Sequence, residues 1–234
     1  MADRVLITGG ASGIGRAIAD RCSQEGYEPV VLDQLKGPGI ITVDMLDVDD
    51  TARALEQALA GGPITRLVNN VGAVFPASFE DQTRQDYSRA WRLNLDSGAQ
   101  CLQALLPGMK EAGFGRVVNM SSRAALGKEL RSAYAATKAA LIGLTRVCAL
   151  ELGPLGITIN AIGPGPIATE LFLKANPSDS PRTKAIIEGV PVKRVGQPED
   201  VANAAAFFLD KRSGFVTGQI LYVCGGLTVG KASV

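Results

Sequence analysis

The segment Val5–Gly15, with the sequence VLITGGASGIG, runs from a short apolar stretch through a glycine-rich turn into a helical stretch. Glycines allow the backbone to turn tightly and to approach a bound anion. The first turn of a helix adds unpaired N–H groups and the positive end of the helix dipole. The spacing T-G-x-x-x-G-x-G in this context favours a phosphate-binding turn over a glycine-rich turn without a ligand.

The rest of the chain alternates between apolar runs and helical stretches. Further runs without polar alternation, typical of strands buried on both faces, occupy 30–33, 40–43, 67–69, 117–120, 157–162 and 220–223. Helices are expected at 13–25, about 49–60, about 83–112 with a candidate break at Pro107, 132–152 and 199–210. This pattern predicts an α/β fold: a doubly wound, Rossmann-type parallel sheet of about seven strands with helices on both faces.

The whole chain, residues 1–234, is expected to form a single dinucleotide-binding and catalytic domain. Only Gln34–Gly39 separates the second and third apolar runs. A parallel crossover normally needs a dozen or more residues. We therefore expect the crossover helix to be missing there and a tight loop to replace it.

Composition narrows the classes of function. The chain has 24 Lys and Arg against 23 Asp and Glu, so no basic surplus favours nucleic acid or an anionic membrane. No apolar run in the sequence approaches the ~20 residues of a membrane span, and no signal peptide is recognised, so a cytoplasmic protein is expected. With no histidine and four widely separated cysteines, we expect no metal site and reduced, structural thiols.

Asp33 closes the second apolar run, 18 residues after Gly15. A carboxylate there can accept hydrogen bonds from an adenosine ribose diol and would repel a 2′-phosphate, which favours NAD over NADP. Lys36 lies close in the sequence and keeps NADP open. An aspartate that only caps a turn is the alternative, because such residues are common at strand ends.

Tyr134 and Lys138 stand four residues apart in the expected helix 132–152, on the same helix face. No other tyrosine has a lysine four residues further on. A nearby cation favours the phenolate, so a lowered pKa of Tyr134 is expected, and the pair is a candidate for proton transfer. The alternative is a half-buried ring beside a solvated cation.

These segments, in this order, resemble the short-chain dehydrogenase/reductase family across essentially the whole chain. The correspondences are Thr8–Gly15 (the cofactor loop), Asp44-Met45, Asn69–Gly72, Asn94, Tyr134–Lys138 (YxxxK) and Pro164–Thr169. With NAD as the cofactor that Asp33 favours, the resemblance implies that the cofactor is bound by Gly9, Ser12, Gly13, Ile14, Gly15, Asp33, Asp44, Met45, Asn70, Val71, Gly72, Tyr134, Lys138, Pro164, Gly165, Ile167 and Thr169.

The resemblance also implies Asn94, Ser122, Tyr134 and Lys138 as catalytic residues, without a metal. Ser122 matches the family's serine by local motif, whereas Ser121 has the common spacing of 13 residues before the tyrosine. We expect Ser122, with a one-residue deletion in the loop that follows. A serine pair that closes a strand is otherwise often a hydrogen-bonded turn.

The activity that the resemblance implies is hydride transfer between NAD(H) and a secondary alcohol or ketone, with Tyr134 as general acid and base. The alternatives are a 3-oxoacyl thioester (acyl-carrier) reductase and a regulator that senses the dinucleotide without turning it over. The partners expected are a small-molecule substrate and, by resemblance, further copies of the chain in a homotetramer with D₂ symmetry.

Residues from about 166 to 195 are expected to form a substrate lid, because a long, proline-containing stretch follows the sixth apolar run. The tail 225–234 could close part of the pocket or a neighbour's. Lys128 and Arg131 could receive an acidic substrate group, although surface solvation is the commoner role of such charges. Apolar substrate contacts are expected from Phe75, Leu126, Leu130, Leu171, Phe172, Leu173, Ile186 and Ile187, with core packing as the equal alternative for the lid residues.

Overall fold

The computed structural model describes residues 3–229; residues 1–2 and 230–234 of the expected domain, including the end of the tail, lie outside this range. Seven strands form one all-parallel sheet in the order β3-β2-β1-β4-β5-β6-β7. The strands are β1 (Arg4–Thr8), β2 (Glu28–Asp33), β3 (Ile40–Thr42), β4 (Arg66–Asn69), β5 (Gly115–Met120), β6 (Ile157–Pro164) and β7 (Ile220–Val223). The predicted doubly wound sheet is confirmed.

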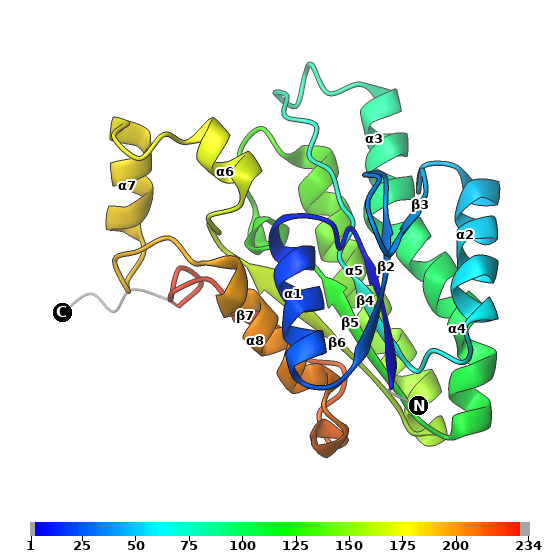
Figure 1. The fold of residues 1–234 in the computed structure, drawn as a ribbon. Coiled ribbons are helices and arrows are strands. Elements are labelled where there is room, and N and C mark those ends of the chain that lie inside the picture. Colours follow the sequence, from blue (N-terminus) through cyan, green and yellow to red (C-terminus); the bar gives the residue numbers. More distant parts are fainter. Residues whose placement is uncertain (1–2, 230–234) are drawn as a thin grey trace.

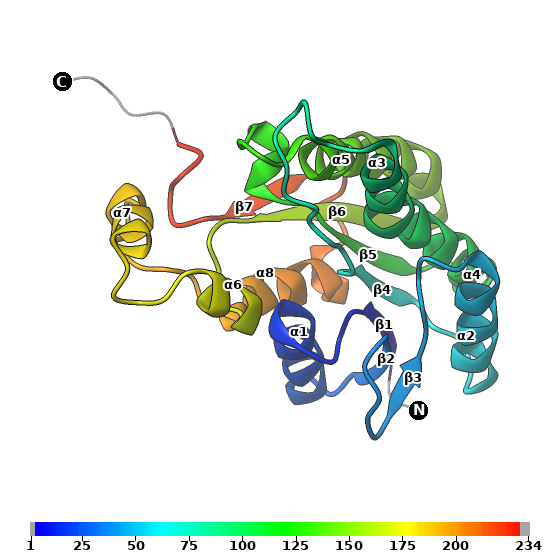
Figure 2. The same ribbon diagram turned by 90° about the horizontal axis from the view of Figure 1, so that it is seen from above.

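Helices cover both faces of this sheet (Figures 1 and 2). One face carries α1 (Gly13–Gln24) and α8 (Pro198–Leu209), and the other carries α2 (Val48–Ala60), α4 (Ser97–Ala112) and α5 (Ser132–Leu152), with α3 (Arg84–Trp91) beside α5. Short 3₁₀ turns lie at Arg123–Leu126, Gly153–Leu155 and Lys211–Ser213. Two short helices, α6 (Glu170–Ala175) and α7 (Pro181–Gly189), stand apart from both layers.

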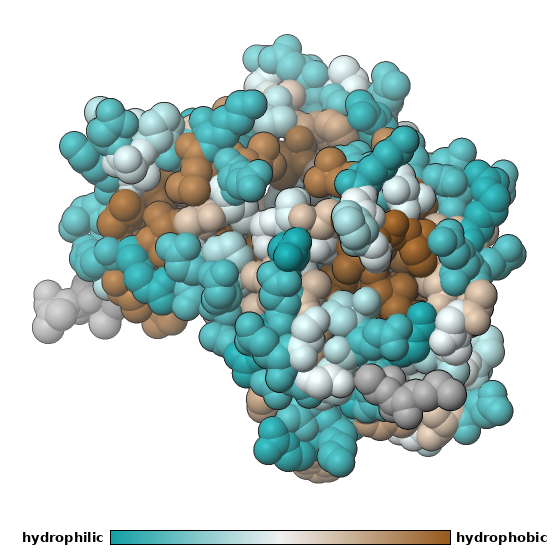
Figure 3. All heavy atoms as spheres, in the orientation of Figure 1, coloured by the Kyte–Doolittle hydropathy of each residue, from teal (hydrophilic) through white to brown (hydrophobic). Residues whose placement is uncertain are grey.

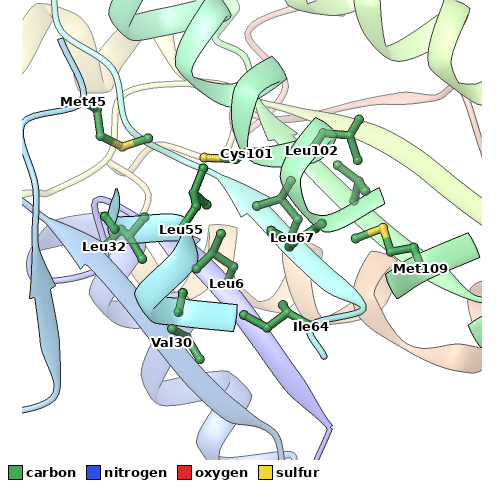
Figure 4. Packing of buried hydrophobic residues seen from close by; sticks show 14 of the residues in the cluster. Leu6, Val30, Leu32, Met45, Leu55, Ile64, Leu67, Cys101, Leu102 and Met109 are labelled. Atoms are coloured by element: carbon green, nitrogen blue, oxygen red, sulfur yellow. The ribbon is translucent and has the colours of Figure 1, made fainter. Parts of the chain in front are cut away.

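Two hydrophobic cores hold the layers together. The core under α2 and α4 includes Leu6, Leu32, Leu55 and Leu67, and Figure 4 shows these side chains packed between helix and sheet. The core under α1 and α8 includes Phe208 and residues from the opposite faces of the same strands. Because both faces are buried, the central strands need continuous apolar runs, which is the pattern seen in the sequence.

The connection between β2 and β3 has no helix, as predicted: β2 ends at Asp33, β3 begins at Ile40, and the two pair in parallel register. The loop turns through Gly39 with φ +71°. Ile40 and Ile41 are only half-buried, because no crossover helix covers this margin of the sheet. Figure 3 shows apolar surface in this region, on the right of the view.

The expected helix 83–112 is continuous through Pro107, so the candidate break there is wrong. The irregularity lies earlier, where a π-helical segment, Arg92–Asp96, joins α3 to α4. Such segments insert an extra residue into the helical turn and are frequent at functional sites. This one carries Asn94.

Helix α5 corrects one inference from the sequence. With the 3₁₀ turn after it, the stretch Ser132–Leu155 is long and apolar enough to span a membrane by length and composition alone. Its side chains also build the domain: Thr145 accepts a hydrogen bond from Asn119 of β5, and Lys138 donates one to the carbonyl of Met120. These contacts make α5 part of the α/β core.

Candidate active site

The glycine-rich turn lies at the carboxyl edge of the sheet, between β1 and α1. Gly9 and Gly13 have φ of +66° and +53°, in the left-handed region that favours glycine. A Cβ on Gly15 would lie 2.0 Å from the carbonyl oxygen of Gly9, so no larger residue fits there without moving the backbone. The turn therefore exposes main chain to the crevice above β1.

The N-terminus of α1 has no side-chain cap. Ser12 occupies the N-cap position in extended conformation, and its hydroxyl makes no capping hydrogen bond. The helices α2, α3, α6 and α7 differ, because the side chains of Asp47, Thr83, Thr169 and Ser180 cap them. The first N–H groups of α1 are therefore free to bind an anion, and the positive end of the helix dipole favours one. A pyrophosphate lying against the glycine turn would suit this position.

Asn70, just after β4, fastens this turn. Its Nδ2 donates to the carbonyl oxygens of Thr8 at 3.0 Å and Gly9 at 3.1 Å. In return, the Thr8 hydroxyl accepts the N–H groups of Asn70 and Val71 at 3.0 and 3.1 Å. The two strand ends thus lock together and hold the glycine turn in one shape.

Asp33 is buried at the end of β2 and its carboxylate is fixed in place. One oxygen accepts the N–H of Ala11 in the glycine turn, and the other accepts the N–H of Leu35, each at 3.0 Å. Each carboxylate oxygen can accept a further hydrogen bond. A pre-oriented acceptor of this kind, beside the glycine turn, fits the diol of an adenosine ribose.

Not every predicted cofactor residue turns its side chain to the crevice. Met45 packs into the core under α2 (Figure 4), and Ile167 is buried in the core under α8. Val71 also packs against a core. Asp44 lies on the surface, where its carboxylate accepts the N–H of Leu46 at 2.9 Å. Met45 and Ile167 are buried, so only their backbone can face a ligand, whereas Val71 is half-buried.

Ser122 and Tyr134 line one cavity of about 400 Å³. The Ser122 hydroxyl accepts the N–H of Ala124 at 3.0 Å and lies next to the Tyr134 phenol, whose pKa it acts to lower. Ser121 faces the other way: it is buried, and its hydroxyl donates to the carbonyl of Lys138 at 2.7 Å. The serine that meets the tyrosine is therefore Ser122.

Lys138 is buried beside Tyr134 and is 2% exposed. Its Nζ donates to the carbonyl of Met120 at 2.7 Å and lies 5.7 Å from the centroid of the Tyr134 ring. Burial lowers the pKa of Lys138 to about 8. The Tyr134 pKa is raised by burial, with the Ser122 hydroxyl and Arg131 acting in the opposite direction. Burial outweighs these two effects, so the lowered pKa expected from Lys138 is not found.

Asn94 reaches the same centre from the π-helical segment. Its Oδ1 accepts the N–H of Ala73 at 2.7 Å, and its Nδ2 donates to the carbonyl of Ala73 at 3.1 Å and to the Thr137 hydroxyl at 3.0 Å. A Cβ on Gly72 would lie 3.0 Å from Oδ1 of Asn94 and 2.9 Å from Nζ of Lys138. Because Gly72 has no side chain, Oδ1 of Asn94 and Nζ of Lys138 can both lie next to its backbone.

The sequence did not single out Thr137. Its hydroxyl links Asn94 to α5, because it also donates to the carbonyl of Tyr134 at 2.9 Å. The feature of the sequence that could have indicated Thr137 is its position three residues after Tyr134 on the same helix.

The segment after β6 borders both the cavity and the glycine turn. Pro164, Gly165 and Pro166 line the cavity. Thr169 caps the N-terminus of α6, and its methyl carbon would lie 3.2 Å from a Cβ on Gly13. The segment therefore bridges the two parts of the site.

Part of the predicted substrate set lines the cavity: Phe172, Ile186, Lys128 and Arg131 do so, and Leu227 brings in the described part of the tail. Phe75, Leu126, Leu130, Leu171, Leu173 and Ile187 do not. Other lining residues were not predicted: Val74, Arg123, Ala124, Ala185 and Gly189. Figure 3 shows apolar surface on the upper left, where α6 and α7 lie. Within residues 3–229, no group of three or more His, Cys, Asp or Glu side chains could hold a metal ion.

Comparisons with known proteins agree with this arrangement. A family model described as enoyl-(acyl carrier protein) reductase matches residues 9–228. The (2S)-[(R)-hydroxy(phenyl)methyl]succinyl-CoA dehydrogenase subunit BbsD of Thauera aromatica is 35% identical over 94% of each chain. Acetoacetyl-CoA reductase of Allochromatium vinosum is 33% identical over 97% of this chain and 99% of that protein.

Among solved structures, a putative NAD(P)-dependent gluconate 5-dehydrogenase from Beutenbergia cavernae, with bound NADP at low occupancy, has a TM-score of 0.91 at 29% identity over 98% of each chain. The aldohexose dehydrogenase of Thermoplasma acidophilum, ligand-free, also has a TM-score of 0.91, at 30% identity over 100% of this chain and 96% of that one. With a nicotinamide dinucleotide as cofactor and CH–OH or keto groups as the reacting centre, the chain belongs to the short-chain dehydrogenase/reductase family of oxidoreductases.

Proposed function

We propose that the chain is an NAD(H)-dependent dehydrogenase that interconverts a secondary alcohol and a ketone, with Tyr134 as general acid and base. The observation that carries the proposal is that Ser122 and Tyr134 line one cavity and that the buried Lys138 lies beside the Tyr134 ring. The same cavity borders Pro164 and Gly165, which lead to the glycine turn through Thr169.

When bound, the dinucleotide supplies or accepts the hydride. In carbonyl reduction the Tyr134 hydroxyl donates its proton to the substrate oxygen, and in oxidation Tyr134 takes the proton back. The Ser122 hydroxyl donates a hydrogen bond to that oxygen, which strengthens as negative charge grows on it. Lys138 would hold the nicotinamide ribose and place a positive charge beside the phenol, and Asn94 would keep a path for protons to solvent.

The preference for NAD rests on Asp33. Its carboxylate is held by Ala11 and Leu35 where an adenosine ribose would lie, and a 2′-phosphate there would meet a negative charge. The remaining predicted cofactor contacts belong to this proposal: Gly9, Ser12, Gly13, Ile14, Gly15, Asp44, Met45, Asn70, Val71, Gly72, Ile167 and Thr169.

The experiment that tests the function is a panel of ketones and secondary alcohols followed by absorbance of the reduced cofactor, run with NADH and NADPH. We expect turnover of at least one pair, faster with NADH. Dinucleotide binding without turnover of any compound would instead favour a sensing regulator.

Asp33→Ser should reverse the cofactor preference. We expect kcat/KM with NADH to fall about tenfold and the NADH/NADPH ratio to shift by about 100-fold, because the variant loses two acceptors and a repulsive charge. Steady-state kinetics with both cofactors measure the shift. The matched control is Asp20→Ser, which removes the same charge from an exposed position of α1. A wild-type protein that already prefers NADPH would contradict the proposal.

A 3-oxoacyl thioester is the second candidate substrate. It is supported by the relatives named acetoacetyl-CoA reductase and 3-oxoacyl-[acyl-carrier-protein] reductase FabG, the latter from Staphylococcus epidermidis at 30% identity over 95% of this chain and 97% of that protein. The panel therefore includes thioesters.

The segment 166–195 is proposed as the lid of a single domain, 1–234. Phe172 of α6 and Ile186 of α7 reach the cavity, while the two short helices stand outside the helical layers. Their few contacts with the layers support movement on substrate binding.

The proposal also covers assembly and location: the protein forms a homotetramer with D₂ symmetry in the cytoplasm. It binds neither nucleic acid nor membrane. Helix α5 leaves Val147 and Leu150 exposed on one face, and Phe207 and Phe215 are exposed beside α8 and β7. Two separate apolar surfaces suit the two kinds of contact in such a tetramer. Light scattering at micromolar concentration should give four times the monomer mass of 24.4 kDa, and a monomer mass would contradict it.

A further inference from the structure

Three cationic side chains line the cavity beside Ser122 and Tyr134: Arg123, Lys128 and Arg131. Within the described residues none of the three forms a salt bridge, although nine such pairs exist elsewhere in the structure. The one acidic residue in this loop, Glu129, does not line the cavity. The cavity mouth therefore carries positive charge that the protein itself leaves unpaired.

A fourth cation, Arg182, lies on α7 of the proposed lid. Ala185, Ile186 and Gly189 of α7 line the cavity, and Arg182 precedes them by three, four and seven residues. These spacings place Arg182 on the same face of the helix. Arg182 therefore extends the cavity-facing side of α7 toward Lys128.

The electrostatics of Lys128 show that the four cations act on one another. Partial desolvation lowers the pKa of Lys128, and the charges of Arg131, Arg123 and Arg182 lower it further, with Glu129 opposing weakly. Like charges in such proximity destabilise the protein unless an anion neutralises them. Guanidinium groups are well suited to that anion, because they bind carboxylate and phosphate oxygens in pairs.

The backbone of the loop is strained at the same point. Leu130, between Lys128 and Arg131, has φ +57°, in the left-handed region, at a cost of about 1 kcal/mol or more. Its side chain is 55% exposed, so burial does little to offset this cost. Strain of this kind is found where a loop is held in shape for a ligand.

We propose that the substrate carries an oxyanion, a carboxylate or a phosphate ester, which binds Arg123, Lys128, Arg131 and Arg182 while its reacting carbon lies at Ser122 and Tyr134. This inference rests on the proposed function, which fixes the reacting end. Val74, Phe172 and Leu227 give the cavity apolar walls, so an apolar segment joins the two ends of the substrate. Lys128 and Arg182 are exposed, which keeps the oxyanion at the mouth.

Two pairs of oxo compounds test the charge and distinguish its source. 7-Oxooctanoate, whose methylene chain separates the ketone from the carboxylate, is compared with its methyl ester, and acetoacetyl-CoA is compared with the N-acetylcysteamine thioester, which lacks phosphate. In at least one pair, kcat/KM of the charged member should exceed that of the neutral one by about tenfold or more, since each charge-assisted hydrogen bond contributes a factor of that order. The pair that discriminates identifies the carboxylate or the phosphate.

The variants Lys128→Gln and Arg182→Gln should each raise KM for the charged compound about tenfold, with kcat and the neutral compound changed less than about threefold. Both residues are exposed, so folding is not at risk. The matched control is Lys184→Gln, which removes a charge from another face of α7 and should leave both compounds unchanged.

A direct binding measurement separates this inference from the proposed function. Calorimetry with malonate and with pyrophosphate should show binding of at least one anion, weakened about tenfold or more in the Lys128→Gln/Arg182→Gln double variant. If neither substrate pair discriminates and neither anion binds, the oxyanion site is overturned, while Tyr134-dependent turnover of neutral ketones would still uphold the proposed function. If anions bind but Tyr134→Phe keeps full turnover, the proposed function fails and the anion site remains.

Discussion

Tyr134→Phe is expected to lower kcat about 10³-fold while the Kd for NADH changes less than about twofold. The substitution removes only the hydroxyl, so the ring keeps its place 5.7 Å from the Lys138 ammonium and the helix is not disturbed. Without that hydroxyl the cavity keeps Ser122, which can hydrogen-bond the substrate oxygen, but lacks the group that gives it a proton. Steady-state kinetics and NADH fluorescence titration measure the two quantities.

The matched control is Tyr27→Phe. Tyr27 packs against the guanidinium of Arg66, and it lines neither the cavity nor the glycine turn. This variant should retain turnover within about twofold. If Tyr134→Phe kept kcat within tenfold of the wild-type value, Tyr134 would not be the proton donor.

The fold could be predicted largely from the sequence, because buried parallel strands require apolar runs. All seven expected strands form, and α5 spans residues 132–152 as expected. The helices α6 and α7 could not be predicted from periodicity, since they have only 6 and 9 residues. Their caps were the available signal: Thr169 precedes α6, and Ser180 followed by Pro181 begins α7.

The sequence predicted most of the residues of the candidate site, but not how their side chains are oriented. The sequence places Tyr134 and Lys138 on one helix face, but it does not show that the ammonium donates to the Met120 carbonyl, which β5 supplies from 18 residues earlier. For the same reason the direction of the Tyr134 pKa required the structure, since burial depends on neighbouring elements. Arg123 is next to Ser122 in the sequence, yet its place in the cavity depends on the 3₁₀ turn Arg123–Leu126, which the sequence did not predict.

In the proposed lid, too, the sequence could not show which side chains face the cavity. Leu171, Phe172 and Leu173 are adjacent, and only Phe172 lines the cavity, because consecutive residues of a helix point in different directions. Without the helix boundaries, the sequence could not select among the three.

Lys138→Met should remove activity and stabilise the protein. Lys138 is 2% exposed and has no acidic partner in the salt bridges of residues 3–229, so at pH 7 the folded state holds a buried charge. Burial lowers its pKa from 10.5 to about 8. This shift corresponds to a cost on the order of 3 kcal/mol, which methionine avoids.

The net gain is smaller, because the Met120 carbonyl loses its donor at a cost of about 1 kcal/mol. We expect about 2 kcal/mol of added stability at pH 7, or roughly 4–8 °C in Tm, by thermal or denaturant unfolding. The exposed Lys110→Met is the control and should change stability by less than about 0.5 kcal/mol. We expect kcat of Lys138→Met to fall about 10²-fold or more, because the positive charge beside Tyr134 is lost.

The pH dependence of stability tests whether the buried charge of Lys138 is the cause of the stability gain. Between about pH 8 and 10.5 the unfolded wild-type chain binds more protons at Lys138 than the folded protein, so wild-type stability rises with pH across that window. Below about pH 8 the ammonium is protonated in both states, and the cost is constant. The stability difference between Lys138→Met and wild type should therefore be largest below pH 8 and shrink toward pH 10.5. A variant less stable than wild type at pH 7, or a difference that does not change with pH, would show that Lys138 stabilises the fold instead.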